Sequence, residues 1–515
     1  KQAQRLFKLM TAIRQQIKFL ASFFRFIYFY KSLNKIESHE FHKGERRAIS
    51  IVVTPWMYTA VPWFAITVGI YLSRYIIVEY IFDNSKYDSF SLKQRSASFV
   101  QNALIELALN LCKIKYKKVS EIKPISKNDI SKEELTELIL LATKSRIHKF
   151  KTSLNNKERE AFEQSWLSIQ TDQYRLIKPC LEDTKSYKVL IPGGVYGNSG
   201  LYCLALAGKD KISSYDSGLN RLLFSLNGIA GYQQDVSRVA EMVSDHLDNI
   251  SYQKIVEYVT DELSLRTMGL DFYKTQVCSA GTNDLKSNYD IVIPLNITWD
   301  LPALGKHRFF IDNIQWIEET VNFILEKTKF SVCVRQHPHE RHHTSGNDLA
   351  QHLTERFSTN GRFSFISATQ KINSYELIKN SKVVLPYVST IGIEAALLGK
   401  VVVIESSCYY AEQNFVNQAL SKHNYFELIE MACNDKIQPP SEDALRNATI
   451  YYYVSQYCTP LDSEFTPFLE NFNSWYSKKE DVFIGEVEFM LKSLLNKVPS
   501  SFIKSNKFLH SQNPN

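Results

Sequence analysis

Residues 331–338 read Ser331-Val332-Cys333-Val334-Arg335-Gln336-His337-Pro338, an apolar, β-branched run followed by two basic side chains. The first four residues are typical of a buried strand. In an open parallel α/β sheet, ligands bind at the carboxyl ends of the strands. We therefore expect Arg335, His337 and Pro338 to lie at a ligand-binding edge of such a sheet.

A second strand of the same character occupies residues 382–386 and runs into Tyr387-Val388-Ser389-Thr390-Ile391-Gly392-Ile393-Glu394. Ser389 and Thr390 lead into a helix, and the first amides of a helix are free to hold an anion. An arginine, a histidine and a helix N-terminus at neighbouring strand ends make a site of the size of a phosphate. This arrangement predicts a nucleotide-activated substrate.

Other strands of the same sheet are expected on both sides of these two. Residues 290–295 form one, and it ends in Asn296-Ile297-Thr298-Trp299-Asp300, which puts a carboxylate just beyond a strand. Residues 363–366 and 401–404 form two more. Gly399 ends the helix before the last of them, as a glycine after a helix does.

An upstream unit has a similar pattern. Residues 49–53, 62–72 and 75–82 predict strand, helix and strand, a βαβ unit. The alternative is a transmembrane helix, because residues 48–73 carry no charge and are long enough to span a bilayer. Two Rossmann-like halves with a cleft between them are the architecture that we expect.

Two later features of the upstream half are candidate site elements. A strand at 187–191 precedes a loop with four glycines, in which Gly193, Gly194 and Tyr196 make a possible cleft loop. Its spacing is not GxGxxG, so a dinucleotide fingerprint is absent. A short strand after residue 210 is expected to end at Asp216, a second carboxylate, although Asp-Ser-Gly is also common turn chemistry.

The positive charge of the chain is concentrated at its start. The first 36 residues hold eight Lys or Arg and no Asp or Glu, so the rest carries −1 of the total of +7 (7 − 8). That balance argues against a nucleic-acid-binding body. The eight cysteines include no CxxC pair, which favours a reducing compartment.

The basic segment also has a helical apolar face. Arg14, Lys18 and Arg25 lie opposite that face, as expected of a helix lying on an anionic membrane surface. The alternative is a helix packed on the protein body with its charges in water. Six apolar residues share the face by their spacing of three and four: Leu6, Leu9, Ile13, Ile17, Leu20 and Phe24.

Taken together, residues 334–338 and 387–400 resemble the corresponding motifs of bacterial capsule-polysaccharide biosynthesis proteins, a group that includes the retaining β-Kdo transferases. Either motif alone is weak, but the pair in this order and spacing is fairly specific, and the resemblance is strongest over residues 187–410. It implies an α/β, GT-B-like glycosyltransferase with two Rossmann-like domains facing a central cleft. The implied reaction is transfer of Kdo from CMP-β-Kdo to a glycan acceptor in capsule, O-antigen or lipopolysaccharide assembly, with retention.

The resemblance also implies roles for the donor-site residues. Arg335 and His337 would contact the CMP phosphate, with Ser389 and Thr390 beside it. Glu394, one helical turn further, would contact the ribose or the base.

The catalytic carboxylates are implied in the same way. Retaining members of the group use an aspartate nucleophile upstream of the His-Pro motif; Asp300 fits that order best, and Asp216 is the second carboxylate. No cofactor or metal is expected. The run His339-Glu340-Arg341-His342-His343 is not HExxH, and adjacent positions on a loop rarely converge on one ion.

The expected domains follow from these features. They are a basic membrane-associating helix at 1–47, an N-terminal acceptor domain with a helical insertion at 48–285, a C-terminal nucleotide-sugar domain at 286–415 and a helical region at 416–515. The expected partners are a nucleotide-sugar donor, a glycan or glycolipid acceptor and the inner-membrane surface. The expected location is therefore the cytoplasmic face of the bacterial membrane.

Three other interpretations remain open. A transferase for another CMP-activated nonulosonic acid, sialic or pseudaminic, would share the CMP-binding parts. A CDP-alcohol phosphotransferase of wall-polymer type also uses histidines and Ser/Thr on such a frame. A catalytically inert, membrane-attached subunit of a polysaccharide assembly complex would tolerate loss of Asp216, Asp300 and Glu394, all of which this chain keeps.

Overall fold

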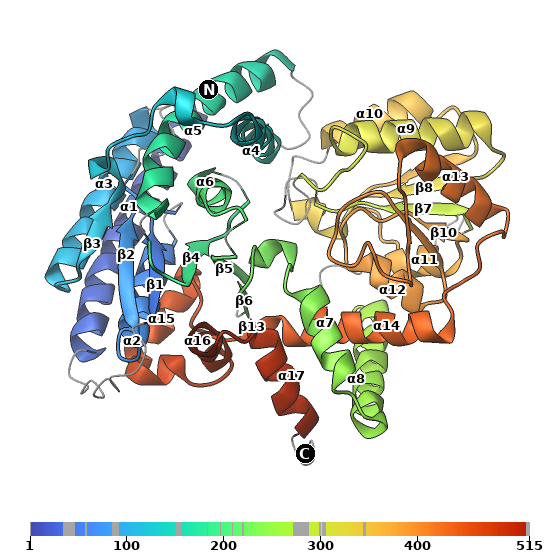
Figure 1. Cartoon of the computed structure of the whole chain (residues 1–515). Coiled ribbons are helices and arrows are strands. Elements are labelled where there is room, and N and C mark those ends of the chain that lie inside the picture. The colour runs from blue at the N-terminus through green and yellow to red at the C-terminus, as the bar shows by residue number, and fades with distance from the viewer. Residues whose placement is uncertain are drawn as a thin grey trace. The chain divides into compact units, whose positions relative to one another are not determined.

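The computed structural model describes residues 2–33, 47–56, 59–84, 92–150, 156–182, 184–195, 197–208, 210–218, 221–270, 288–297, 300, 305–342 and 347–510. These residues form two compact units, labelled by element in Figure 1. The first unit takes in the described residues of 1–141, 167–235 and 458–510, and the second those of 142–166 and 236–457.

The first unit is built on a mostly parallel sheet with the strand order β13-β6-β5-β4-β1-β2-β3. Strands β1 to β5 pair in parallel, whereas β6 and β13 pair antiparallel at one edge. The strands are β1 (Ala48–Val53), β2 (Ile77–Phe82), β3 (Tyr116–Lys118), β4 (Lys188–Pro192), β5 (Ile212–Gly218), β6 (Arg221–Ser225) and β13 (Pro460–Asp462).

Helices cover both faces of this sheet. Alternate residues of β1 point to opposite faces: Ile51 packs in one core with α1, α2 and α3, and Val52 packs in another with α4, α5 and α6. The helices that pass through the first unit are α1 (Gln2–Leu33), α2 (Val61–Leu72), α3 (Leu92–Leu111), α4 (Lys132–Phe150), α5 (Asn156–Glu182), α6 (Gly197–Ala205), α15 (Leu469–Lys478), α16 (Val487–Asn496) and α17 (Ser500–His510).

The uncharged stretch at 48–73 is the β1–α2 part of a βαβ unit, as predicted. Helix α2 is apolar because it is buried in the core, where Trp63 is fully enclosed. Within the described ranges, no helix has the length and apolar character needed to cross a membrane.

Helix α1 packs onto the core with a different face from the apolar face that its spacing predicted for a membrane surface. Phe19, Phe23 and Phe26 are buried against Trp63, with the Phe26 and Trp63 ring centroids 5.0 Å apart. The predicted apolar face points away from the core. Its described members are exposed by 42 to 64%, and Met10 and Tyr28 extend it: Met10, Ile13, Ile17, Leu20, Phe24 and Tyr28. The side chains of Leu6 and Leu9 lie outside the described residues.

The second unit is built on a wholly parallel sheet with the strand order β12-β11-β10-β7-β8-β9. The strand predicted at 331–334 is β8, shifted by one residue. The strands are β7 (Ile291–Pro294), β8 (Val332–Arg335), β9 (Phe363–Ile366), β10 (Val383–Val384), β11 (Val401–Ile404) and β12 (Asn417–Gln418).

Helices also lie on both sides of the second sheet. Figure 1 shows α9, α10 and α13 on one side and α11 and α12 on the other. On the first side, Trp316 of α9 donates its indole N–H to the Tyr425 hydroxyl of α13 at 3.0 Å. The helices of this unit are α7 (Val236–Asp245), α8 (Asn249–Met268), α9 (Asn313–Lys327), α10 (Asn347–Phe357), α11 (Ser374–Lys379), α12 (Ile391–Leu397), α13 (Lys422–Cys433) and α14 (Glu442–Tyr453).

The predicted α/β class with two Rossmann-like halves is confirmed by these two sheets. The division of the chain differs from the expected boundaries, because the described residues of 142–166 and of 416–457 fall in the second unit. Helices α7 and α8 belong with the second unit, not the first. The chain returns to the first unit at residue 458, where β13 joins the edge of the first sheet and α15 to α17 follow.

Candidate active site

Both sheets have the strand order of a doubly wound fold. In the second unit β8 and β9 extend the sheet on one side of β7, and β10 to β12 extend it on the other. Ligands of such sheets bind beside the carboxyl ends of the strands where the order reverses, here β7 and β10. Asn296, just after β7, accepts the backbone N–H of Val388, just after β10, at 3.3 Å. The loops after the two strands are therefore joined at this point.

The loop at 387–390 is held at each of its residues by another element. The hydroxyl of Ser406 donates to the carbonyl of Tyr387, and the Tyr410 hydroxyl donates to the carbonyl of Ser389 at 2.5 Å. A side chain at Gly392 would have its Cβ 2.3 Å from that Tyr410 hydroxyl, so glycine is required there. The loop is thus fixed before any ligand arrives.

The loop brings Ser389 and Thr390 together, with both side chains partly exposed. Ser389 Oγ lies 3.4 Å from the backbone nitrogen of Ile391, a weak contact. Helix α12, which follows, has only seven residues. The two hydroxyls, more than the dipole of so short a helix, are what this loop offers to an anion.

Arg335 is the last residue of β8, and its side chain points into the protein. It is 1% exposed, and its guanidinium nitrogens donate to Ser374 Oγ at 3.3 Å and to the carbonyls of Ser367 and Ile372 at 2.5 and 3.1 Å. A guanidinium bound in this way fixes the backbone around it. We therefore assign Arg335 to holding the loop after β9, in place of the phosphate contact that was expected.

The residues after Arg335 are also fixed. The side chain of Gln336 donates to Glu340 Oε2 at 2.8 Å and accepts from the backbone N–H of Ala368 at 2.8 Å. Pro338 is buried and begins the short 3₁₀ helix Pro338–His342. These bonds hold the turn that carries His337 at the carboxyl end of β8.

His337 is partly buried and is a neutral hydrogen-bond donor. Its Nδ1 accepts the backbone N–H of His339 at 3.2 Å, so the ring proton is assigned to Nε2. Burial, with lesser effects of His339 and Arg335, lowers the pKa of His337 to about 4. At neutral pH the side chain therefore offers an N–H without a positive charge, contrary to the protonated form that a phosphate contact suggests.

Glu394 lies in the first turn of α12 and is buried at 2% exposure. Arg266 Nη1 of α8 donates to its Oε1 at 2.5 Å, and the Tyr375 hydroxyl of α11 donates to its Oε2 at 2.9 Å. Both carboxylate oxygens thus have protein donors. The expected contact of Glu394 with a ribose or base would have to compete with them.

Asp300 is exposed, and its backbone N–H donates to the carbonyl of Ile297 at 3.1 Å. The residues next to it, 298–299 and 301–304, lie outside the described part of the chain. The segment resumes at Gly305, and the N–H of Lys306 donates to the Tyr387 hydroxyl at 2.8 Å. The segment that carries Asp300 therefore starts after β7 and returns to Tyr387, in the loop after β10.

That return is reinforced by His307. Its ring stacks on Tyr387, with centroids 3.9 Å apart and an angle of 17° between the planes. Its Nδ1 lies 2.6 Å from Glu405 Oε1, and its Nε2 lies 3.0 Å from Asn313 Oδ1. Glu405 follows β11 directly, so the Asp300 segment is tied to the same edge of the sheet at both ends.

The remaining predicted residues belong to the first unit. Asp216 lies within β5, which continues to Gly218, and not at the end of its strand as expected; its Oδ1 accepts the N–H of Ser217 at 2.8 Å. Gly193 and Gly194 follow β4 with φ of +66° and +115°, which favour glycine. A Cβ at Gly193 would lie 3.1 Å from the Trp56 ring, which follows β1. Tyr196 lies outside the described residues.

The side chains near the carboxyl edge of the second sheet were not all predicted. Asn296 gave a signal, because it directly follows a strand. Arg266 and Gln456 gave none, since they lie on helical segments far along the chain from Glu394 and Thr390.

Within the part of the chain that is described, no three His, Cys, Asp or Glu side chains are grouped to hold a metal ion. His343 and the side chain of His342, from the histidine-rich run, are outside that part. The absence of a metal remains a prediction.

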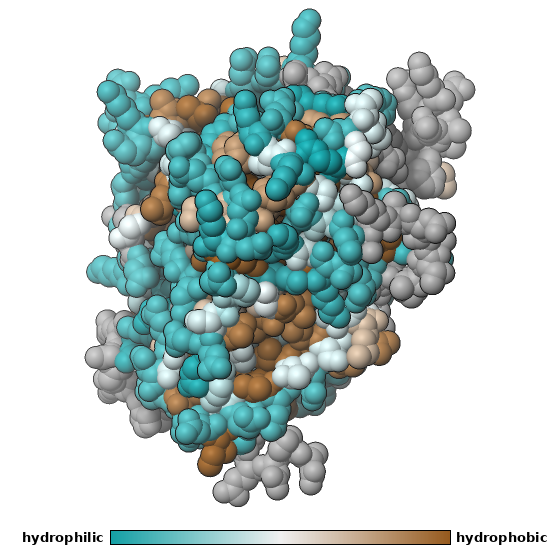
Figure 2. Space-filling model, turned by 90° about the vertical axis from the view of Figure 1, so that its right-hand side faces the viewer, coloured by the Kyte–Doolittle hydropathy of each residue, from teal (hydrophilic) through white to brown (hydrophobic). Residues whose placement is uncertain are grey.

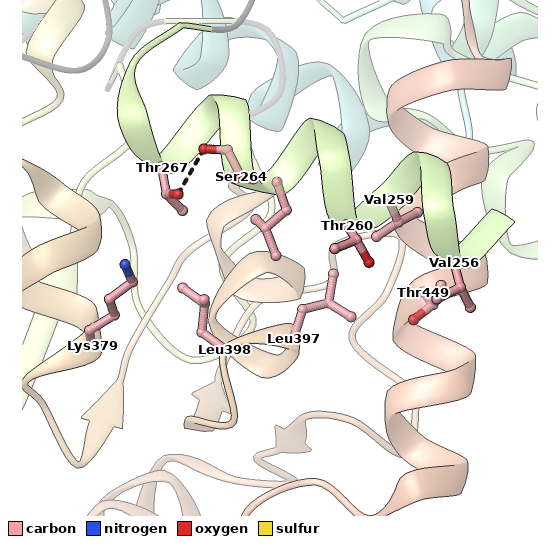
Figure 3. A pocket seen from close by; sticks show the side chains of 10 residues that line it. Val256, Val259, Thr260, Ser264, Thr267, Lys379, Leu397, Leu398 and Thr449 are labelled. Carbon is pink, nitrogen blue, oxygen red and sulfur yellow. Dashed lines mark hydrogen bonds between the residues drawn. The ribbon is translucent and has the colours of Figure 1, made fainter. Parts of the chain in front are cut away.

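A groove of about 330 Å³ lies in the second unit among α8, α11, α12 and α14. Figure 2 shows apolar side chains gathered in the lower half of the right-hand side of the molecule. In the close view of Figure 3, Leu397 and Leu398 lie across the groove from α8, with Lys379 at one end. None of the lining residues comes from the loops at the carboxyl edge, so the groove is a separate feature.

No protein-family model matches the chain, and no curated protein matches it. Among solved structures, it is similar to KpsC beta Kdo 2,7 transferase of Thermosulfurimonas dismutans, with 14% identity and a TM-score of 0.34 over 56% of this chain and 82% of that one. The KpsC beta Kdo 2,4 transferase of the same organism has 11% identity and a TM-score of 0.34 over 56% of this chain and 87% of that one. UDP-GlcNAc 2-epimerase of Neisseria meningitidis has 14% identity and a TM-score of 0.24 over 79% of this chain and 95% of that one. At such scores, the function has to be inferred from the chain's own residues.

Proposed function

We propose that this protein is a glycosyltransferase of bacterial surface-polysaccharide biosynthesis that transfers Kdo from CMP-β-Kdo to a glycan acceptor with retention. One observation carries the proposal: the loops after the adjacent strands β8, β7 and β10 bring His337, Asn296, Ser389 and Thr390 to one edge of the sheet. The resemblance of these loops to the capsule-polysaccharide family supports CMP and Kdo as the parts of the donor.

The donor phosphate would be bound by neutral groups. His337 Nε2–H and the hydroxyls of Ser389 and Thr390 can donate to its oxygens, in a loop that Tyr410 and Ser406 keep in place. Donors fixed in advance stabilise the charge that grows on the leaving phosphate without reorganising. Since His337 has a pKa of about 4, donor binding at neutral pH needs no protonated histidine.

Transfer with retention by double displacement needs a nucleophile, and a carboxylate can serve as one. Asp300 is exposed on a segment tied at both ends to the carboxyl edge. Its attack on the anomeric carbon would expel CMP and form a glycosyl–enzyme ester, which the acceptor hydroxyl would then displace from the opposite side. Two inversions give net retention. Asp216 remains the candidate for the acceptor proton.

The nucleotide is tested by calorimetric titration with CMP, CDP, UMP and UDP. We expect selective binding of CMP, and we expect His337→Ala to weaken it by at least about tenfold, because a hydrogen bond to a charged group contributes ~1.5–3 kcal/mol. His423→Ala, at an exposed position of α13, is the matched control and should bind as the wild type does.

Each other result selects a different function. Preference for CDP would favour the CDP-alcohol phosphotransferase, and preference for a uridine nucleotide would refute CMP as the donor nucleotide. Binding of none of the four would favour the inert subunit. With CMP selected, turnover of CMP-Kdo against CMP-sialic and CMP-pseudaminic acids identifies the sugar.

We further propose that the protein works at the cytoplasmic surface of the inner membrane, bound through α1. The exposed apolar face of α1 runs from Met10 to Tyr28, and Arg14, Lys18 and Arg25 are exposed on the same helix. Apolar residues inserted at the headgroup boundary, flanked by cations, fit an anionic lipid surface. The opposite face is already used by Phe19, Phe23 and Phe26 in the core.

A vesicle-binding experiment tests this surface. We expect the double variant Ile17→Glu/Phe24→Glu to lose at least about tenfold in affinity for phosphatidylglycerol vesicles, because burying one large apolar side chain contributes ~1.5–3 kcal/mol. Ile250→Glu/Met268→Glu makes the same charge change at two exposed apolar residues of α8 and should bind as the wild type does. An equal loss of vesicle affinity in both variants would mean that net charge alone is responsible. Failure of the wild type to bind the vesicles would refute the proposal that α1 binds a membrane.

A further inference from the structure

Gln456 contacts Thr390, the last residue of the loop at 387–390. Its Nε2 lies 3.5 Å from Thr390 Oγ1 and 3.3 Å from Ser455 Oγ, and its Oε1 accepts from Arg266 Nη1 at 3.1 Å. It belongs to the π-helical turn Val454–Cys458 that follows α14. Turns of this kind are rare and are frequent at functional sites.

Arg266 decides which way the Gln456 amide faces. The oxygen and nitrogen of an amide side chain are hard to tell apart by shape. A guanidinium only donates, so the amide oxygen must face Arg266 and the amide nitrogen must face Thr390. Thr390 Oγ1 therefore accepts in this contact, and the proton of its hydroxyl is left to point elsewhere.

Arg266 is in turn fixed by Glu394 and Tyr375. Burial by itself lowers the pKa of Arg266, but the carboxylate of Glu394 raises it well above the ordinary value. Burial and the same carboxylate raise the pKa of Tyr375, so its hydroxyl stays protonated and donates to Glu394 at 2.9 Å. Tyr375 and Arg266 thus both donate to Glu394, and Arg266 also donates to Gln456, so donor and acceptor are settled at each contact.

We propose that Gln456 is a positioning residue of the donor site, which turns the Thr390 hydroxyl so that its proton is donated to a phosphate oxygen of a nucleoside monophosphate. Arg266, Glu394 and Tyr375 set the orientation of Gln456. The inference rests on the donor role proposed above for Thr390, and it gives Glu394 a part in the site that does not require contact with the ligand.

The length of the Gln456–Thr390 contact agrees with this role. At 3.5 Å it is long for an N–H···O hydrogen bond. A hydroxyl that donates to an anion becomes a better acceptor, because hydrogen bonds in series polarise one another. The contact is therefore expected to shorten when the phosphate is bound, so that ligand binding and the orientation of Gln456 reinforce each other.

The test is a double-mutant cycle on nucleotide affinity, with the nucleotide that the wild type prefers among CMP, CDP, UMP and UDP. Gln456→Glu keeps the size of the side chain and the acceptor for Arg266, but it replaces the donor toward Thr390 by an acceptor. We expect affinity to fall about tenfold with the thermal midpoint nearly unchanged, since one hydrogen bond contributes ~0.5–1.5 kcal/mol and more beside a charge.

The second member of the cycle is Thr390→Val, which removes the hydroxyl. In the Thr390→Val background, Gln456→Glu should lower nucleotide affinity no further, because the two positions act through one contact. In Thr390→Ser, which keeps a hydroxyl, Gln456→Glu should still cost about tenfold, as in the otherwise wild-type chain. Gln438→Glu, an exposed position of the same unit, controls for the added negative charge.

Each outcome decides a separate point. Wild-type affinity in Gln456→Glu overturns the positioning role, and so does a loss that persists undiminished with Thr390→Val. A wild type that binds none of the four nucleotides overturns the donor site itself, and with it this inference.

Discussion

Replacing Asp300 by Asn is expected to lower kcat for transfer from CMP-Kdo by about 10³-fold or more, which is the scale of losing a covalent nucleophile. The amide has the size of the carboxylate but cannot attack the anomeric carbon. Asp300 is exposed, so the free energy of unfolding should change by no more than about 0.5 kcal/mol. Nucleotide affinity should stay close to that of the wild type, because His337, Ser389 and Thr390 are untouched.

Single-turnover kinetics and calorimetry on the same preparation separate these effects. Asp245→Asn, at an exposed position of α7, is the matched control and should turn over normally. A glycosyl adduct found by mass spectrometry on the peptide that contains Asp300 would support the covalent step. Wild-type turnover by Asp300→Asn would remove this residue from the mechanism and leave Asp216→Asn as the next variant to measure.

The positions of the strands could be predicted because the apolar runs are short, β-branched and bounded by polar loops. The strand expected at 331–334 is found at 332–335, and the carboxyl-edge loops follow from it. Strand β10 is only two residues long although five were expected, because Pro386 has no N–H to continue a ladder. The pairing β7–β10, which brings Asn296 beside Val388, joins segments 92 residues apart and leaves no local pattern.

The inward direction of Arg335 was not predicted, in spite of a local signal. Val332 and Val334 pack in one core, so the residue after Val334 must face the other side of the sheet, where Ser374 of α11 lies. The basic charge of Arg335 suggested a ligand contact. The alternation of side chains along the strand instead indicates that the Arg335 side chain points into the protein. The protonation of His337 could not be predicted at all, because burial and the N–H of His339 set it.

The exposed face of α1 shows that one helix can carry two apolar faces. The spacing of Ile13, Ile17 and Phe24 defines a genuine apolar face, and the structure leaves it outside the core. A second set, Phe19, Phe23 and Phe26, packs the same helix onto the body. Only tertiary packing against Trp63 selects between the two sets, since both recur at helical spacing.

Replacing Arg266 by Met is expected to lower the stability of the protein strongly. Among the described residues, it would leave the buried Glu394 carboxylate with the Tyr375 hydroxyl as its one side-chain donor. Breaking a buried ion pair by removing one partner costs about 3–5 kcal/mol. We expect a loss of that size in denaturant unfolding followed by a probe placed in the second unit, together with a fall in nucleotide affinity.

A triple variant separates the structural effect from the positioning effect. Arg266→Met/Glu394→Leu/Tyr375→Phe replaces these three side chains by apolar ones of similar size and removes both buried charges together. Such replacements are often neutral for stability, so most of the loss should be recovered. Nucleotide affinity should stay low, because the Gln456 amide then has no guanidinium to orient it. Recovery of affinity together with stability would mean that the network only supports the fold, whereas a triple variant as unstable as Arg266→Met would refute the ion-pair argument itself.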